Sequence, residues 1–421
     1  MDAHLERVLA RQNGNPSQLW NKKVKKRIET YLANIKSDPQ CTPTIDNLAE
    51  AAITFGTARI IISTIENLML YVEILKAARH MVVEESGMAL HHYIACISMV
   101  ITPYSLFACG DSRQTEPFRT FKLHDAPKLG TQSLAEHLEK TAPYAAVHLN
   151  KCYRSHPILT QVLSEAAYNN ELEPGVNAVQ REILGPSGRW LPVQSVPIML
   201  IDARGRSLSM EERSHKNASQ CWYATQMVEL IEQSVPGLEI AVICYYREDA
   251  REVSRLFQSK YGKPSLSELT RESPLHRIKR LQVSTVRAYT GKETDVCIVV
   301  TGANEITSKK IEDNFLFKAS QGRVATSRGR LGTVIIGKMN LLVHQASGPI
   351  GDYVKIAAKL TPAIDAEYYF KHIFNTDVHK WYNTNGVLEF DNKSILAECD
   401  INRTLEWDKK TTGFANIVHP V

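Results

Sequence analysis

The sequence has no long apolar segment, no paired-cysteine pattern and little excess charge. The segment Leu90 to Gly110, part of the longest stretch without Asp, Glu, Lys or Arg, contains histidines and a proline, so it predicts a buried helix followed by a strand and not a membrane span. Eight cysteines occur without a CxxC pair, which excludes a zinc knuckle or a disulfide framework and favours free thiols in a reducing compartment. The net charge of +5 is only a weak indication of an anionic partner.

What is present is the composition of an ordinary globular protein, with 43% hydrophobic and 23% charged residues. A length of 421 residues has room for two or three domains with cores of their own. No signal peptide is recognisable, so we expect a cytoplasmic or nuclear protein without a membrane partner.

A compact polar cluster, Leu149–Leu159, combines an aromatic ring, a guanidinium and an imidazole before a proline. Arg154 can bind a phosphate with two donors, and the ring of Tyr153 can stack on a base. Because Pro157 disfavours helix at His156, we expect an extended segment or a turn there. An exposed basic turn is the alternative interpretation of this cluster taken alone.

Three apolar runs in the first part of the chain are typical of buried parallel strands: residues 58–64, 80–83 and 104–109. Ser63 and Thr64 would lie at the carboxyl end of the first, where open α/β sheets carry ligand contacts.

Two adjacent carboxylates, Glu84 and Glu85, follow the second of these runs. Carboxylates directly after a buried strand are costly unless they are paired, and a divalent cation with an attacking water is the usual reason. A solvated strand end is the alternative. The third run continues into Gly110, Asp111 and Gln114, which would place an amide near whatever the carboxylates hold.

The later part of the chain repeats the pattern of strands with polar ends. The run 240–246 predicts a strand followed by a helix, and 283–300 predicts two strands joined by a glycine turn. Residues 323–330 predict a basic turn before a strand at 333–337, which would place several guanidiniums at one end of a sheet. Each feature alone is also typical of surface decoration.

Taken in this order over residues 58–345, these segments resemble the superfamily 1 helicases of the Upf-like, DNA2/NAM7 type. The family's DEA-type acidic box corresponds to Glu84–Gly87. The GDxxQxxP box is met by Gly110, Asp111, Gln114 and Pro117, and the YRxHP box by Tyr153, Arg154, His156 and Pro157. The TVxxxQGxExD box is met by Thr285, Val286, Gly291, Glu293 and Asp295. The NVAxTRA box is met by Val324, Ala325 and Arg328, with Ser327 in place of threonine.

The resemblance implies an α/β protein of the P-loop NTPase fold, with two RecA-like parallel-sheet lobes that use ATP and Mg²⁺. The first lobe would be incomplete at its N-terminal side. The implied organisation is a helical segment at 1–57, a partial first lobe at 58–150, a second lobe at 151–345 and a tail at 346–421 that packs on the second lobe.

The resemblance also implies residue roles. Glu85 would be the general base on water and Glu84 a magnesium ligand. Gln114, Arg154 and Arg328 would surround the γ-phosphate, and Tyr153 would stack on adenine. The resemblance further implies contacts with the nucleotide by Gly110, Asp111, Gly291 and Glu293. It implies contacts with nucleic acid by Ser63, Thr64, Cys244, Tyr246 and Thr285.

Several positions depart from the family pattern. No GxxxxGK[ST] phosphate loop occurs, and the partial match Gly332–Lys338 predicts a β-strand instead of a glycine-rich loop. The other replacements are glutamate for aspartate at Glu84, threonine for glutamine at Thr290, Cys244-Tyr245 for Thr-Pro, and arginine for asparagine at Arg323. We therefore expect weak ATP binding and a degenerate or truncated helicase.

Two functions compete at this point. One is an ATP-driven motor on single-stranded RNA or DNA, with RNA-decay or processing proteins as partners. The other is a non-hydrolysing module that only binds nucleic acid or proteins.

Overall fold

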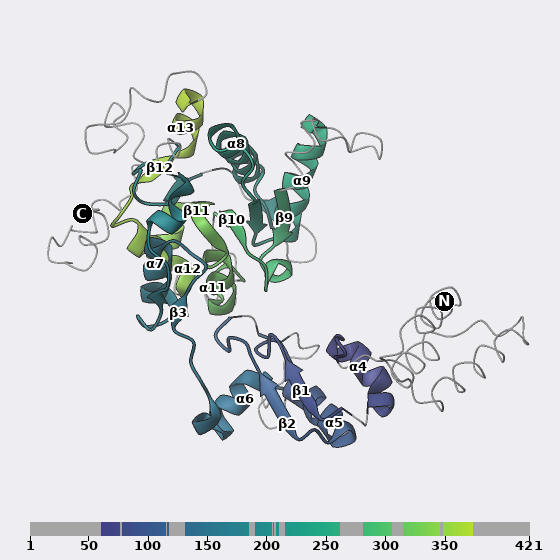
Figure 1. Ribbon diagram of the computed structural model, residues 1–421. Helices are drawn as coiled ribbons and strands as arrows, with labels where there is room; N and C mark the ends of the chain where they lie inside the picture. The colour runs from purple at the N-terminus through teal and green to yellow at the C-terminus, as the bar shows by residue number, and fades with distance from the viewer. Residues whose placement is uncertain are drawn as a thin grey trace, which may run out of the picture. The chain divides into compact units, whose positions relative to one another are not determined.

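The computed structural model describes residues 60–75, 78–114, 116–117, 131–184, 190–203, 205, 208–209, 215–261, 281–304, 315–345 and 348–373. The predicted helical segment 1–57 and the part of the tail after residue 373 lie outside them. Two compact units are present, Met1–Gly110 with Pro117–Pro143, and Asp111–Glu116 with Tyr144–Val421 (Figure 1). Within the described ranges, no helix is long and apolar enough to cross a membrane.

The first unit contains two parallel strands, β1 and β2, whose register pairs Val83 with Ala108. Its core is formed by apolar residues of the helices, among them Ile94, Ile97 and Leu134. The prediction of a helix followed by a strand in 90–110 is therefore confirmed. The elements are α4 (Ile65–Tyr71), a 3₁₀ turn (Val72–Leu75), β1 (His80–Val83), α5 (His91–Ile101), β2 (Ser105–Ala108), α6 (Leu134–Thr141) and a 3₁₀ turn (Pro143–Ala145).

The predicted strand at 58–64 is wrong for its described part. Residues 60–64 form a loop, and Ile62 is 93% exposed. The hydroxyl of Thr64 accepts a hydrogen bond from the amide of Asn67 at 3.3 Å, so Thr64 caps α4 and does not end a strand. Val82 and Phe107 are also largely exposed, so β1 and β2 are not the doubly buried strands that their sequences predict.

The second unit is built on six parallel strands in the order β12-β5-β11-β10-β8-β9. The strands are β5 (Ile198–Asp202), β8 (Ile240–Cys244), β9 (Leu281–Thr285), β10 (Thr294–Val300), β11 (Gly329–Gly337) and β12 (Ala363–Asp365). β5 and β8 are buried along their whole length, as expected for continuous apolar runs. The predicted α/β class with a parallel sheet is confirmed.

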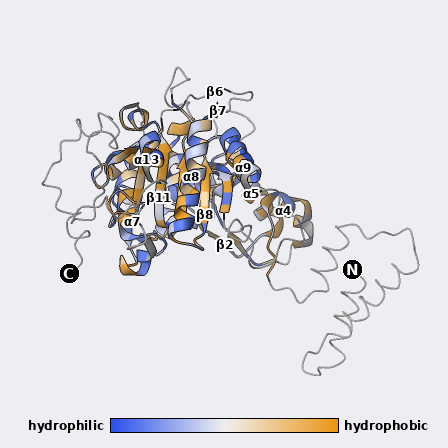
Figure 2. Cartoon of the chain, turned by 90° about the horizontal axis from the view of Figure 1, so that it is seen from above, coloured by the Kyte–Doolittle hydropathy of each residue, from blue (hydrophilic) through white to orange (hydrophobic). Residues whose placement is uncertain are grey.

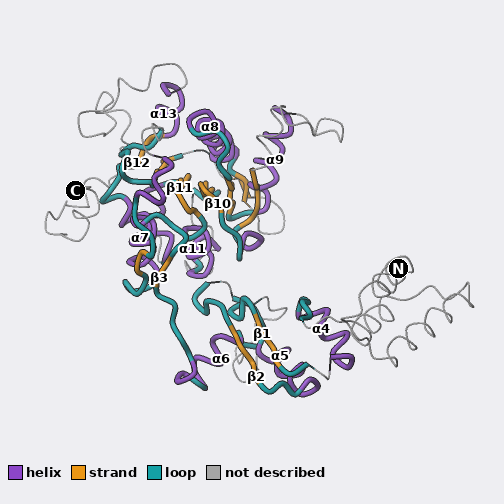
Figure 3. Tube along the Cα trace, in the orientation of Figure 1, coloured by secondary structure: helices purple, strands orange, loops and turns teal. Residues whose placement is uncertain are grey.

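Helices cover both faces of this sheet (Figures 1 and 3). The helices α7, α11 and α12 share one apolar core with one face of the strands, and α8, α9 and α13 share a second core with the other. Figure 2 shows hydrophobic residues along β8, β11 and the helices around them. The bounds are α7 (Pro157–Ala167), α8 (Ala218–Ser234), α9 (Arg247–Tyr261), α11 (Ala319–Thr326), α12 (Pro349–Ala357) and α13 (Ala366–Ile373).

Short elements connect these layers. They are β3 (Lys151–Cys152), β4 (Glu173–Pro174), β6 (Leu208–Ser209), β7 (His215–Lys216), the 3₁₀ segments Val179–Leu184, Arg287–Tyr289 and Phe315–Phe317, and the π-turn Leu341–Gln345.

The strand β11 decides two sequence predictions. It contains all of 332–337, which confirms that Gly332–Lys338 is no phosphate loop. It also begins at Gly329 and not at Thr333, while Arg323 lies on α11, so the predicted basic turn at 323–330 is wrong. The guanidiniums of this segment come from a helix end and a strand start.

Candidate functional site

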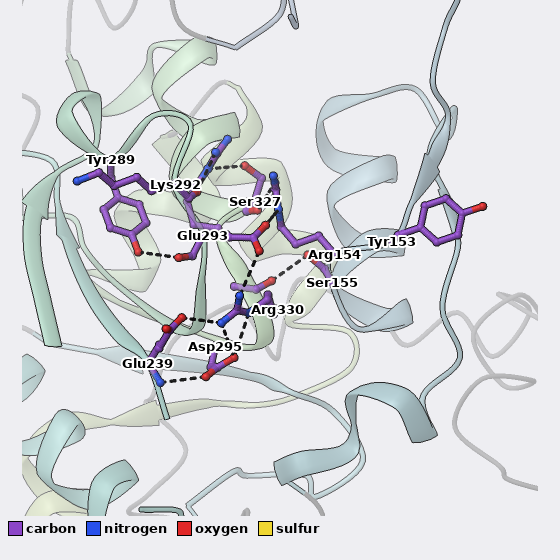
Figure 4. A network of polar contacts seen from close by, with 12 residues as sticks. Tyr153, Arg154, Ser155, Glu239, Tyr289, Lys292, Glu293, Asp295, Ser327 and Arg330 are labelled. Atoms are coloured by element: carbon purple, nitrogen blue, oxygen red, sulfur yellow. Dashed lines mark hydrogen bonds and ion pairs between the residues drawn. The ribbon is translucent and has the colours of Figure 1, made fainter. Parts of the chain in front are cut away.

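Charged side chains gather where β8, β10 and β11 begin (Figure 4). Because these strands are parallel and β10 starts level with β11, their amino ends share one edge of the sheet. Arg330 binds three carboxylates there: Nη2 lies 2.6 Å from Glu239, Nη1 lies 3.1 Å from Glu293 and Nε lies 3.0 Å from Asp295. The burial of Glu293 opposes ionisation, but Arg154 and Arg330 together lower the pKa of its carboxyl below the usual value.

Arg154 belongs to the same cluster. Its Nε donates to the carboxylate of Glu293 at 2.7 Å and its Nη1 to the carbonyl of Ser327 at 3.4 Å. The next residue, Ser155, donates through its hydroxyl to the carbonyl of Gly329 at 2.8 Å. These bonds fasten the Tyr153–Pro157 segment to the start of β11, so the YRxHP and NVAxTRA boxes meet although they lie far apart in sequence.

Tyr153 points away from this network (Figure 4) and is 63% exposed. One face of its ring lies on the backbone of Gly175, where an added Cβ would approach Cδ1 to 2.8 Å. Arg181 donates to the carbonyls of Tyr153 and Arg154, each at 2.8 Å, and so holds the backbone beneath the ring. A supported and exposed aromatic ring is suited to stacking on a planar group.

His156 has a structural place in this segment. Its backbone is extended, and its Nδ1 accepts from the amide of Ile158 at 3.2 Å, so it caps α7 directly before Pro157. The extended conformation predicted from the proline is confirmed. Burial lowers the pKa of His156 to about 4, which keeps the ring neutral and Nδ1 free to accept.

Arg328 and Gln114 face each other. Arg328 is 2% exposed, and its Nη2 donates to Oε1 of Gln114 at 2.7 Å while Nη1 donates to the carbonyl of Lys292. The amide of Gln114 in turn donates to Oδ2 of Asp111 at 2.9 Å. Arg154 contacts Ser327 and Glu293, the chain neighbours of Arg328 and Lys292. The structure therefore brings together Gln114, Arg154, Arg328 and Glu293, with Gly291 in a left-handed turn beside them at φ 78°.

Two residues near Gln114 were missed from the sequence as contributors to this site. The hydroxyl of Tyr168 donates to Oδ2 of Asp111 at 2.6 Å, and burial together with Asp111 raises the pKa of this tyrosine. Arg323 donates to the carbonyl of Arg113 at 2.5 Å. Tyr168 lies in no box, and Arg323 was noted only as a departure from the family's asparagine.

Glu84 and Glu85 lie in the first unit, in the turn that follows β1. Glu85 has a left-handed backbone, with φ 51°. Gly110 passes so close to this turn that a Cβ would lie 2.6 Å from the amide nitrogen of Ser86, which explains the glycine of the GDxxQxxP box. In the ranges that the structure describes, no three metal-binding side chains gather. The convergence of Glu85 with the arginines stays a prediction.

Among the residues expected along nucleic acid, Cys244, Tyr246 and Thr285 lie at or just beyond the opposite, carboxyl ends of strands in the large sheet. Cys244 ends β8 and Thr285 ends β9. The side chain of Cys244 has no exposed surface and Tyr246 is also buried, and their contacts with nucleic acid stay a prediction. A continuous apolar strand between two neighbours leaves such side chains inside the core. Thr285 is half-buried, and the hydroxyls of Ser63 and Thr64 lie on an exposed loop.

Comparisons with known proteins find an AAA domain and helicase relatives. A family model described as "AAA domain" matches residues 130–340, about half of the chain. Helicase sen1 of Schizosaccharomyces pombe is 27% identical over 55% of this chain and 13% of its own length. Regulator of nonsense transcripts 1 homolog of Arabidopsis thaliana is 26% identical over 63% of this chain and 20% of its own length. The chain thus spans about a fifth or less of these relatives.

Among solved structures, the C-terminal domain of a possible DNA helicase from Lactobacillus plantarum WCFS1 matches with 13% identity and a TM-score of 0.27. That match covers 48% of this chain and 93% of the other.

Proposed function

This chain belongs to the superfamily 1 helicases of the Upf-like kind, and we propose that its second unit supplies the arginine-bearing half of an ATP site that drives movement along single-stranded nucleic acid. The observation that carries the proposal is the gathering of Gln114, Arg154 and Arg328 at the amino edge of one parallel sheet.

The chemistry of phosphoryl transfer suits this edge. A γ-phosphoryl group in transfer carries charge on its equatorial oxygens, which guanidiniums and an amide donor stabilise. In the ligand-free chain, Arg154 is bound to Glu293 and Arg328 to Gln114. The protein oxygens hold both guanidiniums in place, and an entering phosphate would exchange for them. The exposed ring of Tyr153 would stack on the adenine.

The acidic residues of this proposal, Glu84 and Glu85, belong to the first unit. When ATP and Mg²⁺ are bound, the metal neutralises the phosphates, and we assign Glu84 to that metal and Glu85 to the water. The left-handed backbone of Glu85 supports this assignment, because strained conformations of non-glycine residues cluster at functional sites.

The partner we propose is single-stranded RNA or DNA, bound through its phosphate backbone. Thr285 in the second unit and Ser63 and Thr64 in the first unit are the candidate hydroxyl donors. Relatives named as regulators of nonsense transcripts make RNA-decay proteins candidate partners in the cytoplasm or nucleus.

A second candidate is a non-hydrolysing module. It is favoured by the sequence between 1 and 421, which offers no GxxxxGK[ST], and by β11, which occupies the one partial match. Without that loop the phosphates lack their backbone cradle, so we expect weak nucleotide binding and negligible ATP turnover by this chain alone.

The test measures binding of a fluorescent ATP analogue, and phosphate release with and without single-stranded RNA. Arg328→Gln should weaken binding roughly 10- to 100-fold, since it removes a charge-assisted hydrogen bond, and Tyr153→Ala should weaken it through lost stacking. Arg251→Gln is the matched control, because Arg251 is 62% exposed on α9 and pairs with Glu248. Equal binding by all four proteins would refute the site.

The same assay separates the two candidates. RNA-stimulated phosphate release that Glu85→Gln abolishes would establish the motor and exclude the non-hydrolysing module. Nucleotide binding without release would favour the module.

A further inference from the structure

The loop Asp111–Gln114 is held by bonds that none of the family boxes accounts for. Asp111 accepts from the amide of Arg113 at 2.8 Å through Oδ1, and its carbonyl accepts from the amide of Gln114 at 3.2 Å. The loop is thus a tight turn closed on Asp111. The positions of its side chains then depend on the groups that bind Oδ2, the second oxygen of the Asp111 carboxylate.

Tyr168 holds that oxygen. Its hydroxyl donates to Oδ2 of Asp111 at 2.6 Å and accepts from Nε2 of Gln114 at 3.3 Å, while Gln114 also donates to the same Oδ2. The three groups form a closed triangle in which every donor has an acceptor. The triangle also decides which way the amide of Gln114 points, because its nitrogen faces the carboxylate and its oxygen faces the guanidinium of Arg328.

Arg323 holds the loop from its other side. It lies in the last turn of α11, and Nη1 donates to the carbonyl of Arg113 while Nε donates to the carbonyl of Ala167, the last residue of α7. A cation at the C-terminal end of a helix is favourable, and one planar guanidinium can span two carbonyls where an asparagine side chain reaches only one. Burial lowers the pKa of Arg323.

The surroundings complete this arrangement. The guanidinium of Arg113 lies 5.8 Å from the ring centre of Tyr168 and pairs with Glu171 at 2.8 Å. Apart from Arg328, the residues described here as holding the loop come from α7, from the residues that follow it, or from α11.

We propose that Tyr168 and Arg323 are positioning residues that fix the Asp111–Gln114 loop and aim the side chain of Gln114 at Arg328. Neither residue touches substrate. The consequence for phosphate recognition rests on the proposed function, whereas the clamp on the loop does not. Arg323, which departs from the family's asparagine, is here part of the clamp and not a loss.

The experiment measures amide hydrogen exchange of the peptide covering 111–117 in the full chain. Tyr168→Phe removes one hydroxyl and keeps the ring, and Arg323→Lys keeps the charge but cannot span both carbonyls. Each should speed the exchange of the Arg113 and Gln114 amides roughly tenfold, with the peptides of the sheet unchanged. Tyr245→Phe is the matched control, because it removes a buried hydroxyl without a hydrogen-bond partner among the described residues.

A second readout compares the affinities for fluorescent ATP and ADP analogues. Because Gln114 is placed at the γ-phosphate, Tyr168→Phe should lower the preference for triphosphate over diphosphate, and binding of the diphosphate should not change. A merely structural role of Tyr168 would weaken both nucleotides equally.

The outcomes separate the two claims. Unchanged exchange in both variants overturns the clamp, whatever the nucleotide data show. Faster exchange confined to the loop supports it, even if the wild-type chain binds no nucleotide, a result that would refute only the proposed function. Faster exchange throughout the second unit would also overturn the clamp, because the variants would then act on the fold.

Discussion

Replacing His156 by asparagine should remove most of one pH-dependent contribution to stability and leave the fold intact. His156 caps α7 through Nδ1, which requires a neutral ring, and burial lowers its pKa from 6.5 to about 4. Asparagine is also a good N-cap and does not titrate. The variant therefore keeps the cap and loses the proton linkage.

The sign and size follow from the two pKa values. Above pH 6.5 both folded and unfolded chains carry a neutral His156. As the pH falls towards about 4, the unfolded chain binds a proton that the folded chain excludes, so the free energy of unfolding falls by about 1.4 kcal/mol per pH unit. The total contribution is about 3 kcal/mol, and below pH 4 it changes no further.

The assay is urea unfolding followed by circular dichroism at pH 4.5, 5.5, 6.5 and 7.5. Relative to wild type, His156→Asn should gain stability at the acid end, apart from a constant offset of about 1 kcal/mol for the smaller side chain. His148→Asn, at an exposed position, is the control and should follow wild type. Parallel curves for His156→Asn and wild type would refute the buried neutral cap.

Four further predictions concern other sites. Burial raises the pKa of Asp249 from 3.8 to about 7, so its ionisation lowers the free energy of unfolding by about 4 kcal/mol as the pH rises between these values. Asp249→Asn should remove this fall in the same urea series, and an unchanged dependence of the unfolding free energy on pH would contradict it. Gly110→Ala places a Cβ against Ser86 and should destabilise the first unit by about 1–3 kcal/mol, seen as faster limited proteolysis within residues 78–110. Arg330→Met removes the guanidinium from Glu239 and Asp295 and leaves Glu293 with Arg154 alone, so it should cost about 1–3 kcal/mol in urea unfolding, less in high salt; a salt-independent loss would argue against the ion pairs. Binding of a labelled single strand should weaken steeply between low and moderate salt, and no binding at low salt would favour a protein partner instead.

Local chemistry explains the predictions that hold. Pro157 restricts the residue before it, so the extended conformation of His156 follows from two neighbouring residues. Runs such as 240–244 are apolar without interruption, a pattern typical of a strand buried on both faces. The sequence 332–338 likewise has strand character, which is why it could be set aside as a phosphate loop.

The wrong strand prediction at 58–64 has a physical cause, since apolar character is not the same as burial. Residues 60–62 are as apolar as a core strand, yet the cap formed by Thr64 makes the following segment a helix and leaves them in an exposed loop. Cys244 and Tyr246, which the resemblance places along nucleic acid, are enclosed by their neighbours. Local sequence does not report which neighbours a strand acquires.

By itself, the sequence determined the family boxes and the order in which they occur, because the boxes are short and their conformations are set by nearby glycine, proline and apolar residues. Only the tertiary structure decided what each charged group binds. Glu239 pairs with Arg330, and Tyr168 with Asp111, across separations of 91 and 57 residues. Such pairs depend on strand order and helix packing, which place distant segments a few ångströms apart and leave no trace in the spacing of the residues.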